Sequence, residues 1–180
     1  EKKIKNLIKK NINKNNLIII SDYGHGFLSE KNAKMISKTK KYLALNAQVN
    51  AANIGYHTMT KYNNIDAMII NETELRHEMR DKNEKIDNLS KKLLHLINIK
   101  DLVVTRGTNG AILSTKNSKN KYSCPAFANK LLDKVGAGDT MLALLSLMLK
   151  AGCPKDLSLL IGSFAGAFSV EIMFFFMMIV

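Results

Sequence analysis

The stretch DKVGAGDT, residues 133–140, combines flexible residues with a carboxylate just ahead of an apolar helical run. A glycine-rich turn entering a helix exposes backbone N–H groups that have no intrahelical partner, and these groups attract anions such as phosphate. Asp139 would repel a phosphate, so binding alone does not account for it; taking a proton from a hydroxyl that attacks phosphorus does. The spacing also allows a structural role, with Asp139 as a helix cap and Gly136 and Gly138 packed against a strand.

Two further polar stretches follow apolar runs. NETE places Asn71 and Glu74 three residues apart at an expected helix start, on one helix face. Alone, this pattern favours a strand-end asparagine with a helix-capping acid. TRGTNG, residues 105–110, alone favours a hairpin-like turn, in which Arg106 contacts a phosphate or is simply solvated.

Strand-like and helix-like stretches alternate along the chain. This alternation predicts an α/β fold with three layers and a mostly parallel sheet. In such sheets ligands gather at the carboxyl ends of the strands, where the polar motifs stand. We expect helices over 1–16, from the cap Ser29 to about Tyr42, and over 72–80, 84–97, 136–152 and 154–172, with strands at 17–21, 42–50, 66–71, 101–105, 110–116 and 120–126.

The 180 residues carry a net charge of +12, and arginine contributes only three of the basic residues. Arginine is the better phosphate reader, and no aromatic residues alternate with the lysines, so we interpret the lysines as solvated surface and expect no nucleic-acid partner. The two cysteines, Cys124 and Cys153, have no metal-like spacing and favour a reducing compartment.

The C-terminal segment is strongly apolar. Residues 157–180 are long enough to cross a membrane and hold Gly162 and Gly166 in G-x-x-x-G spacing. Glu171 would be costly in lipid, and the GAGD context predicts a buried helix here instead, so we expect no membrane association. The last stretch, 171–180, is an atypical apolar tail for which truncation or a frame change is one explanation.

Four motifs together resemble the ribokinase-like (PfkB) carbohydrate kinases. DKVGAGDT is similar to that family's C-terminal signature, NETE to its N-x-x-E motif, and VVTRGTNGA to its nucleotide-binding strand and turn. SDYGHG, residues 21–26, resembles a turn of the heptose-7-phosphate kinase branch, with His25 in place of the usual lysine. The motifs occur in the family's order over most of 17–170. The resemblance implies a three-layer α/β/α ribokinase-like domain, of which 1–180 would be a single partial domain lacking the N-terminal part and the lid.

The resemblance assigns catalytic roles around the first motif. Asp139 would be the base that deprotonates the acceptor hydroxyl. The backbone of Gly136, Ala137 and Gly138 would form an anion hole for the transferred phosphoryl group. Asp133 would lie near the substrate hydroxyl or a monovalent cation such as K⁺.

The other motifs would serve ATP and its metal. The resemblance implies that Asn71 and Glu74 organise Mg²⁺ through its waters. The nucleotide would be lined by Thr105, Arg106, Gly107 and Gly110.

These roles imply an ATP- and Mg²⁺-dependent cytoplasmic enzyme that phosphorylates a sugar or sugar phosphate, with a heptose phosphate as one candidate. A homodimer is left open for the full-length protein. The alternatives are a kinase of another small alcohol, such as a nucleoside or vitamin, and a non-catalytic nucleotide- or sugar-binding domain. Because the expected sugar pocket is incomplete, we expect these 180 residues alone to be a poor kinase.

Overall fold

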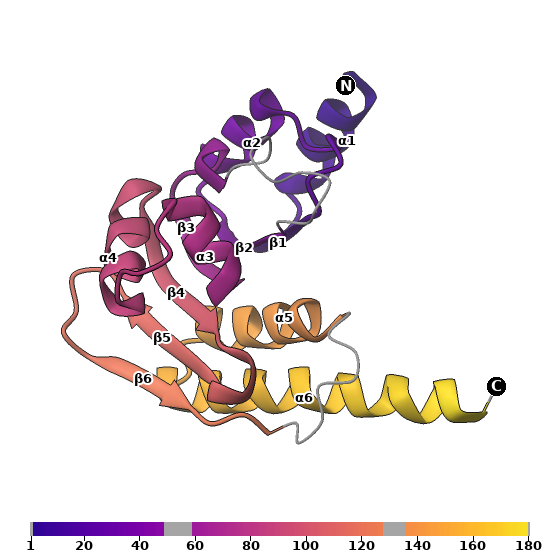
Figure 1. The fold of residues 1–180 in the computed structure, drawn as a ribbon. Coiled ribbons are helices and arrows are strands. Elements are labelled where there is room, and N and C mark those ends of the chain that lie inside the picture. The colour runs from indigo at the N-terminus through magenta and orange to yellow at the C-terminus, as the bar shows by residue number, and fades with distance from the viewer. Residues whose placement is uncertain (1, 49–58, 128–135, 180) are drawn as a thin grey trace.

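A computed structural model describes residues 2–48, 59–127 and 136–179, with only the backbone from 170 onwards. Its helices and strands alternate as the sequence predicts (Figure 1). The helices are α1 (Lys2–Ile12), α2 (Glu30–Ser37), α3 (Glu72–Met79), α4 (Ile86–Leu96), α5 (Ala137–Lys150) and α6 (Lys155–Ile179). The strands are β1 (Leu17–Asp22), β2 (Tyr42–Ala47), β3 (Ile65–Asn71), β4 (Ile99–Thr105), β5 (Ala111–Thr115) and β6 (Lys121–Cys124).

The six strands form one sheet in which spatial order follows chain order, β1 to β6. Strands β1 to β4 are parallel, whereas β5 and β6 add as antiparallel strands at one edge. The expected mostly parallel sheet is therefore confirmed. Because β1 to β4 are parallel, their carboxyl ends lie together at one end of the sheet.

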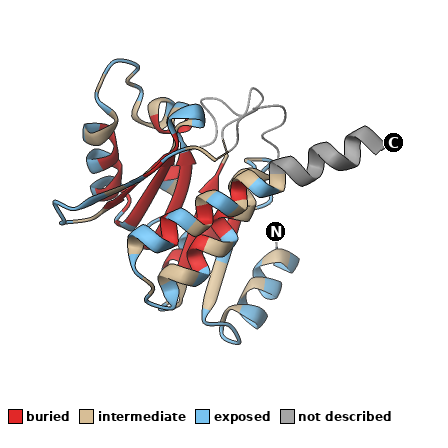
Figure 2. Cartoon of the chain, turned by 90° about the horizontal axis from the view of Figure 1, so that it is seen from below, coloured by how far each residue is buried: buried red, intermediate tan, exposed pale blue. Residues whose placement is uncertain are grey.

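Helices cover both faces of the sheet, so the three-layer expectation is also confirmed. Side chains alternate along each strand. In β2, Leu43 and Leu45 join a buried cluster with α2, α3 and α4, while Ala44 joins another with α5 and α6. Ala44 and its neighbour Ala67 on β3 are small, which lets α5 approach the sheet closely. Figure 2 shows the buried residues concentrated on the strands and on the inner sides of the helices.

Helices α5 and α6 lie side by side, and the G-x-x-x-G pair serves this contact. A Cβ on Gly162 would lie 3.1 Å from the Leu145 Cβ, and one on Gly166 would lie 3.1 Å from the Ala137 carbonyl oxygen. The glycines therefore allow close helix packing within the fold. Within the described part of the chain, no helix is both long and apolar enough to cross a membrane.

The largest differences from the expected element boundaries are at the ends of three helices. Ser29 caps α2 as predicted, but α2 ends at Ser37 because Tyr42 pairs with Leu17 as the first residue of β2. Helix α1 ends at Ile12, before the expected boundary at 16. Helix α6 runs on to Ile179 and does not end near 172, since neither glycine nor proline interrupts the segment beyond Gly166.

Candidate active site

Asp139 lies in the first turn of α5, as the sequence predicts. The N-cap is Gly136, whose φ of 84° lies in the left-handed region that favours glycine. No side chain among the described residues caps this helix start, so the capping role considered for Asp139 is not what the structure shows. The Gly136 carbonyl oxygen instead accepts from the Thr140 N–H at 2.9 Å and from the Thr140 hydroxyl at 3.0 Å.

The end of β1 holds the Asp139 carboxylate. Ser21 Oγ donates to Oδ1 at 2.6 Å, and Tyr23 Oη donates to Oδ2 at 2.6 Å. The hydrogen bond to Asp139 raises the pKa of the Tyr23 phenol, because the carboxylate favours the protonated donor. Ser21 and Tyr23, at the end of β1, thus hold both oxygens of the Asp139 carboxylate, although α5 is far from β1 in the sequence.

Asp22, between these two residues, points to the other side of the strand. It is buried, accepts from Tyr62 Oη at 2.6 Å, and forms an ion pair with Lys61 Nζ at 2.6 Å. The Gly24 N–H donates to it at 3.0 Å. Burial acts to raise the pKa of Asp22, but these hydrogen bonds and the Lys61 charge outweigh it, so the pKa is lowered. Asp22 therefore stabilises the turn that follows β1, through contacts on the side of the strand that faces away from Asp139.

Gly138 is a glycine that packing does not require. It lies inside α5, and among the described residues a Cβ there would meet nothing closer than the Asn46 Nδ2 at 3.7 Å, an ordinary contact distance. Glycine within a helix costs about 0.5–1 kcal/mol relative to alanine. The buried Asn46 donates to the Ile69 carbonyl oxygen at 3.1 Å, and its Oδ1 has no partner among the described residues. The space beside Gly138 is thus open to a group that approaches the backbone of the helix start.

Asn71 and Glu74 form a capping box at the start of α3. The Asn71 side chain accepts from the Glu74 N–H at 2.8 Å, and Glu74 Oε2 accepts from the Asn71 N–H at 2.8 Å. The structural interpretation of NETE is therefore observed. The two residues also lie beside the third motif, because Asn71 is the register partner of Thr105 on β4.

Arg106, directly after β4, contacts Glu72, directly after β3, and so links the ends of these two strands. Its Nε donates to Glu72 Oε2 at 3.1 Å, while Arg76 holds Oε1 at 2.9 Å. Burial acts to raise the pKa of Glu72, but both arginines outweigh it, and the pKa is lowered. An arginine that is 30% exposed is thus fixed at the carboxyl edge of β4.

The glycines after β4 have backbone explanations. Gly107 has a φ of 56° and Gly110 a φ of 75°. A Cβ on Gly110 would lie 2.0 Å from the Cys124 carbonyl oxygen, which no side chain could tolerate. The Arg106 N–H donates to the Gly110 carbonyl oxygen at 2.7 Å, so the hairpin-like turn is observed.

The predicted site residues that the structure describes therefore lie at the carboxyl ends of the parallel strands, in two groups. Asp139, Gly136, Ala137 and Gly138 meet β1 and β2, while the other group lies at β3 and β4. Asp133 lies outside the described residues. In the ranges that the structure describes, no three His, Cys, Asp or Glu side chains gather as a metal site would require.

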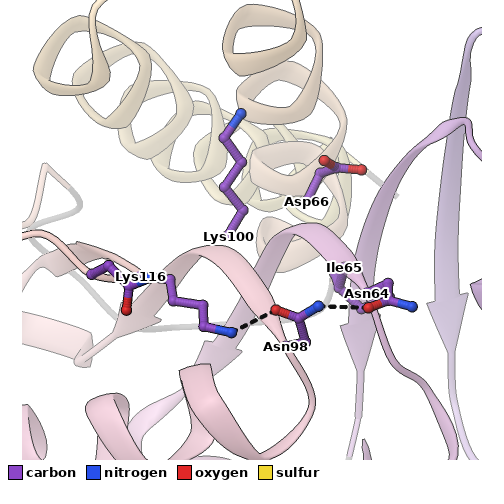
Figure 3. A pocket seen from close by; sticks show the side chains of 7 residues that line it. Asn64, Ile65, Asp66, Asn98, Lys100 and Lys116 are labelled. Atoms are coloured by element: carbon purple, nitrogen blue, oxygen red, sulfur yellow. Dashed lines mark hydrogen bonds between the residues drawn. The ribbon is translucent and has the colours of Figure 1, made fainter.

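A pocket of 390 Å³ lies at the opposite end of the strands, where β3 and β4 begin. Figure 3 shows Lys116 pointing to Asn98, which in turn points to Asn64. None of the predicted site residues that the structure describes is part of its lining. Its lining consists of Asn64, Ile65, Asp66, Asn98, Lys100, Lys116 and Asn117.

Ser21, Tyr23 and Asn46 are the site residues that the sequence analysis missed as individual candidates. A signal for the first two exists, because strand alternation places residues 21 and 23 on one face and 22 on the other. A polar residue within the apolar strand YLALNA is a similar signal for Asn46.

The family model described as "pfkB family carbohydrate kinase" matches residues 5–172. The chain belongs to this family. The match takes in every described site residue named above.

Proteins similar to this pfkB-family chain include the "Bifunctional protein HldE" of Bradyrhizobium diazoefficiens, 25% identical over 174 residues, which cover 95% of this chain and 34% of that protein. The protein of the same name from Geobacter metallireducens is 28% identical over 84% of this chain and 31% of its own length.

The fold is similar to solved kinase structures. Phosphofructokinase-2 from Escherichia coli, in complex with potassium, aligns with a TM-score of 0.75 at 18% identity, covering 93% of this chain and 55% of that one. Ribokinase from Thermotoga maritima aligns with a TM-score of 0.70 at 20% identity, covering 91% and 53%. The ribokinase-like fold is thereby confirmed. The chain spans about a third of the HldE proteins and about half of these structures.

Proposed function

We propose that this chain is the C-terminal portion of a kinase that transfers the γ-phosphoryl group of ATP to a hydroxyl of a sugar or sugar phosphate. The observation that carries the proposal is the start of α5. There a fixed carboxylate, Asp139, follows Gly138, a glycine that neither backbone conformation nor packing requires. Family membership supports the same reaction class.

In the proposed reaction, Asp139 takes the proton of the acceptor hydroxyl. The hydroxyl oxygen forms a bond to the γ-phosphorus as the bond from that phosphorus to the β,γ-bridging oxygen breaks. The electron pair of the broken bond stays on ADP. The N–H groups of Gly136, Ala137 and Gly138 and the dipole of α5 stabilise the negative charge on the transferred group. Gly138, without a Cβ, lets that group approach the backbone.

Oxygen donors at the start of α3 fit a Mg²⁺ ion held through its waters. Asn71 and Glu74 each spend an oxygen on the capping box, so direct coordination through those atoms would disrupt the helix start. Bound there, Mg²⁺ would neutralise charge on the phosphates. Arg106, with Thr105, Gly107 and Gly110, would hold the nucleotide at the neighbouring strand end.

A heptose phosphate is the sugar we propose first, because SDYGHG resembles a turn of the heptose-7-phosphate kinase branch and the HldE proteins match most of this chain. We place Asp133 near the acceptor hydroxyl or a monovalent cation such as K⁺. The cytoplasm fits as a compartment, because both cysteines are free thiols. A kinase of another small alcohol is the alternative that shares this chemistry, while a binding domain would not need Asp139.

The test is Asp139→Asn in the full gene product, assayed for ADP release with D-ribose, fructose 6-phosphate and sedoheptulose 7-phosphate. Loss of the base should lower kcat by about 10²- to 10⁴-fold. ATP affinity, measured by calorimetry, should be retained. Asp156→Asn is the matched control, because Asp156 is an exposed acid in the first turn of α6. A wild-type protein that binds ATP but phosphorylates none of these sugars would contradict the proposal.

A further inference from the structure

The proposed base is already occupied by a hydroxyl of the chain itself. Tyr23 Oη lies 2.6 Å from Asp139 Oδ2, the distance at which an acceptor hydroxyl would have to lie for proton transfer. Ser21 Oγ lies 2.6 Å from the other oxygen, Oδ1. A phenol and a sugar alcohol make the same O–H···O⁻ contact, so Tyr23 marks a position that the acceptor hydroxyl needs.

The two donors differ in how firmly they are held. Ser21 is part of β1, and its backbone pairs in register with Asn46 on β2. Tyr23 follows the last residue of β1, and its side chain is 43% exposed. The Tyr23 ring stacks on His25, with ring centroids 6.5 Å apart and planes 9° apart, and His25 belongs to the same turn. Tyr23 is therefore the donor that can leave.

The backbone beneath Tyr23 does not have to move for this. Asp22 is fixed by Lys61, Tyr62 and the Gly24 N–H on the opposite side of the strand. A rotation about the Tyr23 side-chain bonds, into the solvent that already bathes the ring, suffices to uncover Oδ2. The step breaks the hydrogen bond of the phenol to the carboxylate, together with its weaker contacts to the Ser21 and Gln48 side chains, and the acceptor hydroxyl makes the new hydrogen bond to the carboxylate.

We propose that Tyr23 is a gate on Asp139: its hydroxyl occupies the acceptor position in the unloaded protein and is displaced by the acceptor, while Ser21 keeps the carboxylate oriented. The gate rests on the proposed kinase function. Its consequence is selectivity against water, because a water molecule that reached Oδ2 could be activated like the acceptor and would hydrolyse ATP. Tyr23 itself is a poor nucleophile, since its hydrogen bond to Asp139 raises the pKa of the phenol.

The experiment is Tyr23→Phe in the full gene product, with the best acceptor found among D-ribose, fructose 6-phosphate and sedoheptulose 7-phosphate. The acceptor no longer competes with a phenol, so its KM should fall by about three- to tenfold, the range that one net hydrogen bond is worth. ATP hydrolysis without acceptor should rise. Ser21→Ala should lower kcat and leave the acceptor KM nearly unchanged. Tyr122→Phe, on the edge strand β6, is the matched control and should change neither quantity.

A second readout does not depend on turnover. The ultraviolet difference titration of wild type minus Tyr23→Phe isolates the Tyr23 phenol, and repeating it on the Asp139→Asn background should shift its ionisation to lower pH. If the wild-type kinase is active but Tyr23→Phe raises the acceptor KM, or the phenol titrates alike on both backgrounds, the gate is overturned and the proposed function stands. A protein inactive toward every acceptor overturns both.

Discussion

The amide of Asn46 faces the backbone of Gly138 across the start of α5, at a distance that would admit one methyl group. A Cβ on Gly138 would lie 3.7 Å from Asn46 Nδ2, and no other atom of the residues that the structure describes would lie closer. The chain therefore keeps a glycine in a helix although alanine fits the fold. Stability and activity should respond in opposite directions to a change there.

Gly138→Ala should raise the free energy of unfolding by about 0.5–1 kcal/mol, because alanine restricts the unfolded chain and suits a helix. Phosphotransfer should fall steeply, since the methyl group would occupy space that the transferred phosphoryl group needs. Urea unfolding and ADP release measure the two effects. The control is Ala143→Gly, on the exposed face of the same helix, which should lower stability and leave kcat unchanged. Full activity in Gly138→Ala would argue against the anion hole.

Arg106→Ala should raise the KM for ATP by about three- to tenfold, with little change in kcat, because a guanidinium at the end of β4 would contact the nucleotide in the ground state. The melting temperature should change little, since the pair with Glu72 is partly solvated. Arg76→Ala provides the contrast: Arg76 also donates to the Lys82 and Glu84 carbonyl oxygens, and its loss should destabilise the α3–α4 connection. An unchanged KM would restrict Arg106 to its role as a partner of Glu72.

Asp22→Asn should destabilise the protein by about 3 kcal/mol, because it leaves the Lys61 ammonium, only 14% exposed, without its counter-ion. The pKa of Asp22 is lowered in the folded protein, so its contribution is fully present above the unfolded value near 3.8 and is lost as the pH falls through the lower folded pKa. Wild-type stability should therefore decline with acid more steeply than that of Asp22→Asn. Urea midpoints measured from pH 7 to pH 3 check this; parallel curves would contradict the assignment.

Much of the fold follows from local patterns that are visible in the sequence. The apolar runs LIIIS and DAMII became parallel strands, and the helix after GAGD begins where the glycine turn indicates. Element boundaries were predicted wrongly where strand pairing determines them. The helix expected to end at about Tyr42 ends earlier, because Tyr42 belongs to β2 and pairs with Leu17 of β1.

The sequence identified the candidate site as separate motifs, and the structure adds the contacts between them. The sequence singles out Asp139 but contains nothing that names Ser21 as its partner, since this pairing depends on how α5 crosses the sheet. Conversely, the local pattern suffices for Asn71 and Glu74, because a capping box spans only four residues. Long-range partners require the assembled fold, whereas local hydrogen bonds do not.

The order of the sheet has a consequence for how the protein acquires its chemistry. Each new strand adds beside the one made just before it, so the sheet grows by short-range steps as the chain leaves the ribosome. The contact between Ser21 and Asp139 spans 118 residues and must wait for α5 to be synthesised and to return to the first strand. A nascent chain that holds only β1 to β4 therefore lacks the contact between Ser21 and Asp139, and the proposed base can be oriented only after α5 has packed against the end of β1.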